Sequence, residues 1–235
     1  MKPHIPHTLS MLTAIAMVLT LATCRQPAKE TTPQTPAFNP AIAAFTSGTI
    51  SGQSGIRVVL AEDYHEVVAP NTPVGKKVFR FKPAIEGETF WADSRTIEFR
   101  PAKALPPSTI YEASFMLAEL PEIASDSKSF DFSFRTIRQG FISEIEGLVS
   151  KHKNRDDFYT LRGLLRTADF VEPLSVQKML EAAAQGRILP ISWEHDAGGR
   201  IHRFEVDSIP RLSENYTLQL RWNGSPMNAD MRETQ

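Results

Sequence analysis

Few residues in this chain of 235 residues are suited to chemistry. Cys24 is the only cysteine, so the chain cannot form a disulfide within itself, and this side chain is a candidate for modification. His195 and His202 flank a predicted hairpin turn, with Glu194 and Asp196 beside them. Imidazole and carboxylate groups bind zinc, so suitably paired strands can build a metal site there. Hairpin tips are ordinarily polar, and we therefore favour a solvated turn and predict no metal site.

Motifs of catalysis and cofactor binding are missing from the sequence. It contains no Gly-rich phosphate loop, no HExxH and no Gly-x-Ser-x-Gly elbow. The carboxylate pairs Glu62-Asp63 and Asp156-Asp157 fall in predicted turns and are interpreted as solvated loop charges. The sequence thus predicts no catalytic residue and no cofactor, and an enzyme is the least favoured class of function.

Cys24 lies at the end of an uncharged segment, and this position indicates its role. The residues from Leu9 to Thr23 carry no charge, and they follow a positively charged Lys2. Fifteen residues match the apolar region of a signal peptide and are fewer than the ~20 that a membrane-spanning helix needs. We therefore predict that residues 1–23 form a signal peptide and that Cys24 follows it directly.

The segment Leu21-Ala22-Thr23-Cys24 resembles the lipobox of bacterial lipoproteins. In that family the cysteine thiol is acylated and becomes the mature N-terminus. Thr23 departs from the pattern, because Gly, Ala or Ser usually precedes the cysteine. The resemblance implies lipid attachment at Cys24 in a bacterial cell envelope, and Arg25, in place of Asp, favours the outer membrane facing the periplasm. The alternative is a cleaved secretory signal in which Cys24 has no role.

Residues 24–45 have the composition of a tether. The stretch contains four prolines and little hydrophobic periodicity, which is typical of a solvated and partly extended chain. About twenty such residues in polyproline form span roughly 60 Å. The net charge of −1 gives no basic field that would favour a nucleic-acid partner.

The residues from 46 to 137 have the pattern of a β-sandwich. Apolar side chains alternate along several short segments that prolines and turn residues separate. Asp93-Ser94 is a predicted hairpin turn, and Tyr111, which enters a strand after two prolines, resembles the tyrosine corner of Greek-key sandwiches. Phe130, Phe132 and Phe134 share one face of the last predicted strand.

The residues from 138 to 235 form a second predicted β-sandwich. Alternation recurs over 141–149, 159–165, 188–196, 200–209 and 216–224. A short helix is predicted near 173–185, because Pro173 suits a helix start and Gly186 a helix stop. The expected fold class is therefore mostly β, with two tandem Ig-like or macroglobulin-like sandwiches and one short helix in the second.

The run "FKPAIEGETFWADSRTIEFRPAKALPPSTIYEASF", closing with "FDFSFRT", resembles the N-terminal sandwich of the bacterial alpha-2-macroglobulin family. The later segments "ISWEHDAGGRIHRFEVDSIPR" and "LQLRWNG" are similar to the part of that family that follows. Trp91, Phe99 and Phe115 within the motif are expected to be core residues. The family's Cys-x-Glu-Gln thioester is absent, since Cys24 is followed by Arg25-Gln26-Pro27.

This resemblance implies the N-terminal scaffold of a membrane-anchored protease inhibitor. The partners would be the membrane, through the lipidated N-terminus, and proteases in the complete molecule. The alternative is a stand-alone Ig-like lipoprotein that binds a protein or glycan partner, because sandwich loops commonly carry such sites.

Overall fold

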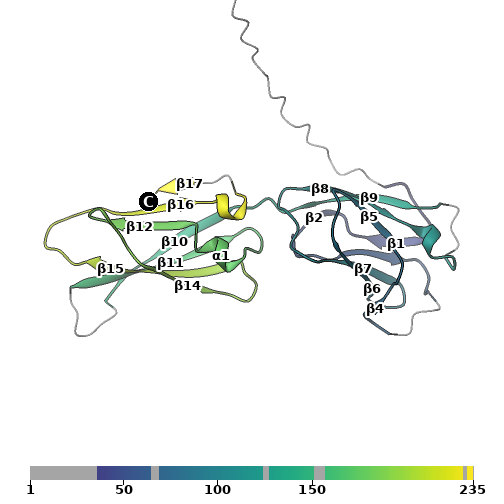
Figure 1. Ribbon diagram of the computed structural model, residues 1–235, viewed down its shortest axis with the longest axis horizontal. Coiled ribbons are helices and arrows are strands. Elements are labelled where there is room, and N and C mark those ends of the chain that lie inside the picture. Colours follow the sequence, from purple (N-terminus) through teal and green to yellow (C-terminus); the bar gives the residue numbers. More distant parts are fainter. Residues whose placement is uncertain (1–35, 65–68, 124–126, 151–156, 230–231, 235) are drawn as a thin grey trace, which may run out of the picture. The chain divides into compact units, whose positions relative to one another are not determined.

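Strands dominate the computed structural model, which describes residues 36–64, 69–123, 127–150, 157–229 and 232–234. They form four sheets, two in each of two β-sandwiches (Figure 1). One hydrophobic core draws its residues from Ile56 to Phe134 and the other from Phe141 to Ala229. The protein is therefore mostly β, as the sequence predicts, and the predicted boundary near residue 137 falls between the last strand of the first sandwich and the first strand of the second.

Nine strands of the first sandwich lie in the described ranges. They are β1 (Ile42–Phe45), β2 (Gly48–Ile50), β3 (Ile56–Leu60), β4 (Thr72–Pro73), β5 (Phe79–Lys82), β6 (Gly87–Trp91), β7 (Thr96–Pro101), β8 (Ile110–Phe115) and β9 (Phe130–Thr136), with a 3-10 turn at Leu117–Glu119. One sheet has the order β1-β3-β7-β6-β4 and the other the order β2-β9-β8-β5. The β2–β9 pair is parallel and the other pairs are antiparallel.

Local patterns account for much of this sandwich. Phe130, Phe132 and Phe134 are all buried on one face of β9, which confirms the predicted alternation. The predicted turn at Asp93-Ser94 joins β6 to β7, and the Asp93 carboxylate accepts hydrogen bonds from the backbone N–H groups of Arg95 (2.8 Å) and Thr96 (2.7 Å). An aspartate that bonds the backbone two residues ahead is a local turn device, so sequence alone can identify it.

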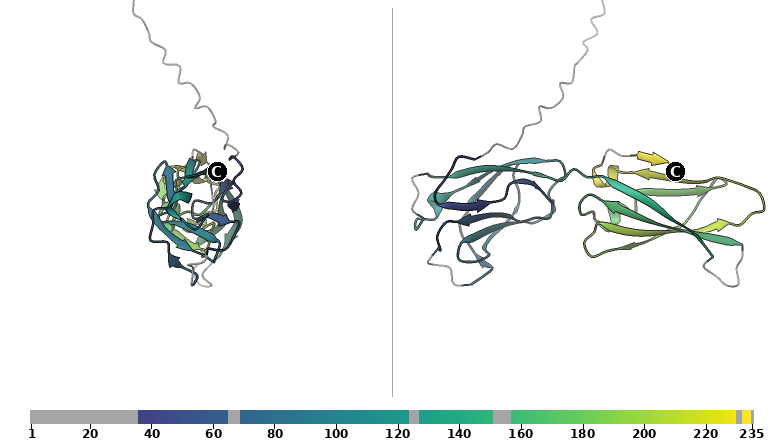
Figure 2. Two further views of the ribbon diagram at one scale, coloured as in Figure 1. Left: turned by 90° about the vertical axis from the view of Figure 1, so that its right-hand side faces the viewer. Right: turned by 180° about the vertical axis from the view of Figure 1, so that it is seen from behind.

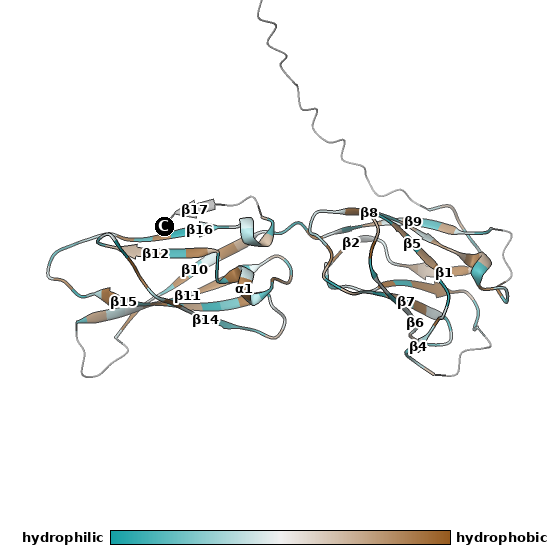
Figure 3. Ribbon diagram, viewed as in Figure 1, coloured by the Kyte–Doolittle hydropathy of each residue, from teal (hydrophilic) through white to brown (hydrophobic). Residues whose placement is uncertain are grey.

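The second sandwich contains the remaining elements. They are β10 (Phe141–Val149), β11 (Phe158–Thr167), α1 (Pro173–Val176), β12 (Leu180–Ala184), β13 (Arg187–Ile188), β14 (Ile191–His195), β15 (Ile201–Pro210), β16 (Leu218–Asn223) and β17 (Arg232–Thr234), with a 3-10 turn at Ser225–Met227. The sheet orders are β10-β11-β15-β14 and β13-β12-β16-β17. In each sandwich the two sheets form facing layers (Figure 2), and hydrophobic and hydrophilic residues alternate along the strands (Figure 3).

The helix predicted near 173–185 is much shorter in the structure. Helix α1 ends at Val176, and residues 180–184 form the strand β12. Alanine has high helix propensity, but Ala182 and Ala184 are buried on one face of β12, which pairs with β13 and β16. Sheet pairing and burial thus override the local preference, and the helical interpretation of the alanine run is wrong.

A tyrosine in the second sandwich makes a bond typical of a tyrosine corner. The Tyr216 hydroxyl donates a hydrogen bond to the backbone carbonyl of Pro210, just before β16 begins. The sequence predicted such a corner at Tyr111 instead. Tyr111 is buried, and its ring stacks on that of Phe134 with 5.2 Å between the centroids. The bond from the Tyr111 hydroxyl to the backbone that such a corner implies remains a prediction.

Candidate functional site

The predicted lipid-attachment residue, Cys24, lies outside the described residues, as do the signal peptide and most of the tether. Lipid attachment there therefore stays a prediction. Within the described ranges, no helix combines the length and the hydropathy that crossing a membrane would need.

The two histidines singled out in the sequence meet in the structure. His195 on β14 and His202 on β15 are directly opposite residues, and their Nδ1 atoms lie 2.9 Å apart. At this distance one Nδ1–H donates to the other Nδ1, so the two Nδ1 atoms satisfy each other. Among the residues that the structure describes, no group of three or more His, Cys, Asp or Glu side chains can hold a metal ion.

Burial affects the charge state of His202. His202 is fully buried, and burial lowers its pKa below the usual 6.5. The nearby His195 lowers the pKa further, while Asp196 and the backbone of Gly199 act in the opposite direction. The Nε2 atoms of both histidines are buried without a hydrogen-bond partner. The lowered pKa favours the neutral form of His202, which is a buried structural residue of this hairpin.

Asp196 acts as a turn residue. Its carboxylate accepts hydrogen bonds from the backbone N–H groups of Ile201 (2.8 Å), Arg200 (2.9 Å) and Gly198 (3.1 Å). The bond from Ile201 is the largest cause that lowers the pKa of Asp196. The interpretation of this tip as a polar hairpin turn thus has a physical basis, because the carboxylate is committed to the backbone.

The predicted loop carboxylates differ in their surroundings. Asp63 accepts a hydrogen bond from the Ser94 hydroxyl at 2.8 Å and lies 3.7 Å from the Arg95 guanidinium. Asp157 is exposed, and its backbone carbonyl accepts a hydrogen bond from the Arg211 N–H. Its neighbour Asp156 lies outside the described residues.

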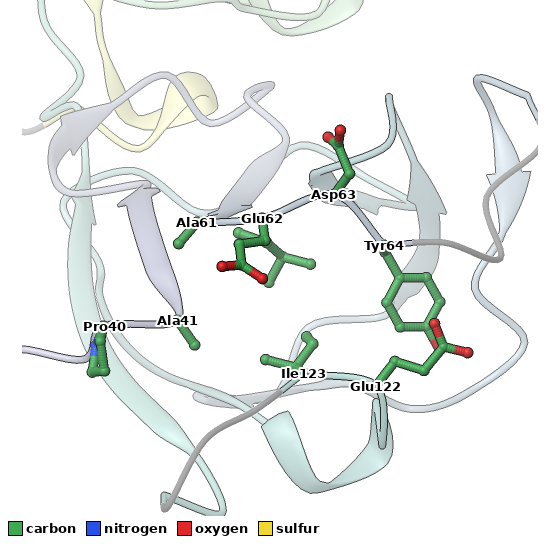
Figure 4. A pocket seen from close by; sticks show the side chains of 9 residues that line it. Pro40, Ala41, Ala61, Glu62, Asp63, Tyr64, Glu122 and Ile123 are labelled. Carbon is green, nitrogen blue, oxygen red and sulfur yellow. The ribbon is translucent and has the colours of Figure 1, made fainter.

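A hollow of about 250 Å³ opens beside Glu62 and Tyr64 in the first sandwich. Figure 4 shows Glu62 extending over this hollow while Asp63 points away from it. The lining combines apolar side chains with an acidic rim, and consists of Pro40, Ala41, Leu60, Ala61, Glu62, Asp63, Tyr64, Glu122 and Ile123. The lining comes from three separate segments, residues 40–41, 60–64 and 122–123. These segments come together only in the tertiary structure, so no sequence pattern identified the hollow. Its chemistry suits a small ligand that is apolar with a cationic end.

The tryptophans have core positions. Trp91 and Trp222 are buried. Trp193 is partly buried, with its ring parallel to that of His195 at 6.1 Å and tilted against that of Phe204 at 5.4 Å. All three lie in strands, so they do not form an aromatic platform at loop tips.

One buried carboxylate could not be predicted from the sequence. Glu98 on β7 accepts hydrogen bonds from Arg57 at 2.9 and 3.0 Å and from Arg100 at 2.9 Å. Burial by itself would raise the pKa of Glu98, but the bonds from both arginines outweigh it, so the pKa is lowered. The alternation of a strand sequence does not distinguish a buried glutamate from an exposed one. The two arginines that bind Glu98 lie in β3 and β7, and the pairing of these strands is a feature of the tertiary structure.

Comparisons with known proteins give little further guidance. No protein-family model and no curated protein matches the chain. Among solved structures, an L,D-transpeptidase from Mycobacterium tuberculosis H37Rv is 15% identical, with 80% of this chain and 78% of that chain covered and a TM-score of 0.27. A similarity at that level carries no argument about function.

Proposed function

We propose that this chain is the N-terminal, membrane-tethered scaffold of an alpha-2-macroglobulin-like protease inhibitor of the bacterial envelope. The lipobox-like segment that ends at Cys24 and the motif run of the first sandwich support this proposal. In the complete molecule the scaffold would position later domains that engage proteases.

One observation carries the scaffold role: the side chains of the motif run are core residues. Trp91, Phe99, Tyr111 and Phe115 are all buried in the first sandwich. A motif whose large side chains are buried preserves a fold, because such residues contribute packing and are inaccessible to a partner. This fits a structural part better than a part that contacts the protease.

Reading the gene beyond codon 235 and testing its product is the direct experiment. We expect the reading frame to continue into further sandwich domains. The complete product should block digestion of a large protein by trypsin while cleavage of a small chromogenic peptide continues, because a trapped protease still admits small substrates. The 235-residue chain should inhibit neither reaction. A stop codon directly after codon 235, or inhibition by the 235-residue chain alone, would contradict the scaffold role.

The second candidate is a stand-alone Ig-like lipoprotein that binds a protein or glycan partner. The hollow beside Glu62 and Tyr64 favours it, since a concave surface with an apolar floor and a polar rim is typical of a binding site. A screen of the purified chain against a glycan array and a library of basic peptides separates the two candidates. Binding that Glu62→Gln abolishes, in a protein whose gene ends at codon 235, would establish the second.

A further inference from the structure

Strand β10 is the outermost strand of its sheet. It spans nine residues, Phe141–Val149, and pairs with β11 on one side only. No described strand pairs with its other edge. The outermost strand of a sheet presents backbone N–H and C=O groups that can pair with a further strand.

The register of β10 places two aliphatic residues on the core face of the sheet. Ile145 lies opposite Gly163 and Leu148 lies opposite Leu161, a buried core residue. The register shifts between Ile145 and Gly147, and this irregularity keeps Leu148 on the same face as Ile145. Both side chains therefore point to the face that the hydrophobic core occupies.

These residues nevertheless lie outside the core. Along the same face of β10, the exposed fraction rises from 4% at Phe141 to 44% at Ile145 and 53% at Leu148. On the opposite face Ile142 is 66% exposed. A long edge strand with uncovered aliphatic side chains on both faces is a surface suited to strand addition.

The charges on β10 indicate which strand fits. Glu144 and Glu146 are exposed between the aliphatic residues, and the guanidinium of Arg166 lies 3.9 Å from Glu144. If two copies of β10 paired antiparallel about Ile145, Glu144 of one copy would face Glu146 of the other. Like charges directly opposite destabilise a strand pair, whereas a cationic side chain opposite a glutamate stabilises it.

We propose that β10 is a docking edge for an extended segment of a partner protein in which apolar and cationic residues alternate. The segment adds to the sheet as a further strand beside β10. Its apolar side chains cover Ile145 and Leu148, and its lysines or arginines lie close to Glu144 and Glu146. This surface lies in the second sandwich, and the inference does not rest on the protease-inhibitor proposal.

Two synthetic peptides test the docking edge on the full chain in detergent. The probe is a fluorescent nine-residue peptide of alternating valine and lysine, and the control has glutamate in place of lysine. We expect the lysine peptide to bind, as measured by anisotropy, and the glutamate peptide not to bind. Hydrogen exchange measured by mass spectrometry should slow over residues 141–149 when the lysine peptide is bound, and should stay unchanged over β14.

Matched variants test the assignment to β10. The double variant Glu144→Lys/Glu146→Lys should weaken binding of the lysine peptide about tenfold or more and should bind the glutamate peptide. Glu88→Lys/Glu112→Lys changes the net charge equally at two exposed strand positions of the first sandwich and should bind as the unchanged protein does. Leu148→Ser removes a half-exposed side chain, so the protein should stay folded while binding weakens.

Three outcomes would overturn the inference. One is equal binding of both peptides, or equal binding by both double variants, because either result would show general charge attraction. Another is exchange protection that lies outside residues 141–149. The third is a dimer in sedimentation experiments that Leu148→Ser dissociates, because that result would assign the edge to a second copy of the chain.

Discussion

His202 has no solvent exposure, although an unperturbed imidazole titrates near neutral pH. Because burial and His195 lower the pKa of His202 in the folded state, the unfolded chain binds a proton more readily. The contribution of neutral His202 to stability is therefore complete above its unfolded pKa of 6.5 and is lost as the pH falls below that value. We expect urea unfolding to show a lower midpoint at pH 5 than at pH 8, and His202→Leu to lessen this difference. An unchanged pH dependence in His202→Leu would refute this role.

Glu98 is nearly buried and receives hydrogen bonds from two arginines. Glu98→Ala should lower the free energy of unfolding by about 1–3 kcal/mol, since charge-assisted bonds are lost while both arginines stay accessible to water. The lowered pKa of Glu98 means that this contribution is present above its unfolded value of 4.5 and is lost as the pH falls further. Denaturant titration at pH 7 measures the effect, and Glu88→Ala, at an exposed position of β6, is the control that should change little.

At the scale of the element, β12 shows that pairing partners decide the conformation of an alanine-rich segment. Ala182 is fully buried and lies opposite Leu220 of β16. Ala182→Leu should lower the free energy of unfolding by about 1–3 kcal/mol, because the core has no room for the larger side chain. Glu181→Leu, on the exposed face of the same strand, should have a small effect, since its pairing with Arg221 lies at the surface. Equal effects of the two substitutions in urea unfolding would contradict the placement of β12.

At the scale of the whole molecule, the predicted lipid anchor at Cys24 is the property that would most affect where the protein acts. We expect Cys24→Ser to abolish labelling by a palmitate analogue and to move the protein from the membrane fraction to the soluble fraction, since acyl chains contribute about 0.8 kcal/mol per buried CH₂. Ser150→Cys restores a thiol at an exposed position without the lipobox-like context and should not restore labelling. Membrane attachment that persists in Cys24→Ser would show that another part of the chain holds the membrane.

The sequence by itself determined the features that depend on neighbouring residues. Period-two alternation in segments such as 130–134 predicted strands and their buried faces, and Asp93 and Asp196 lie in turns because their carboxylates bond nearby backbone groups. The tertiary structure alone decided features that depend on distant residues. Burial between partner strands made β12 a strand despite its alanines, and strand pairing brought the Nδ1 atoms of His195 and His202 together. The uncovered side chains of β10 likewise depend on which strands lie beside and across from it, and no local pattern encodes those neighbours.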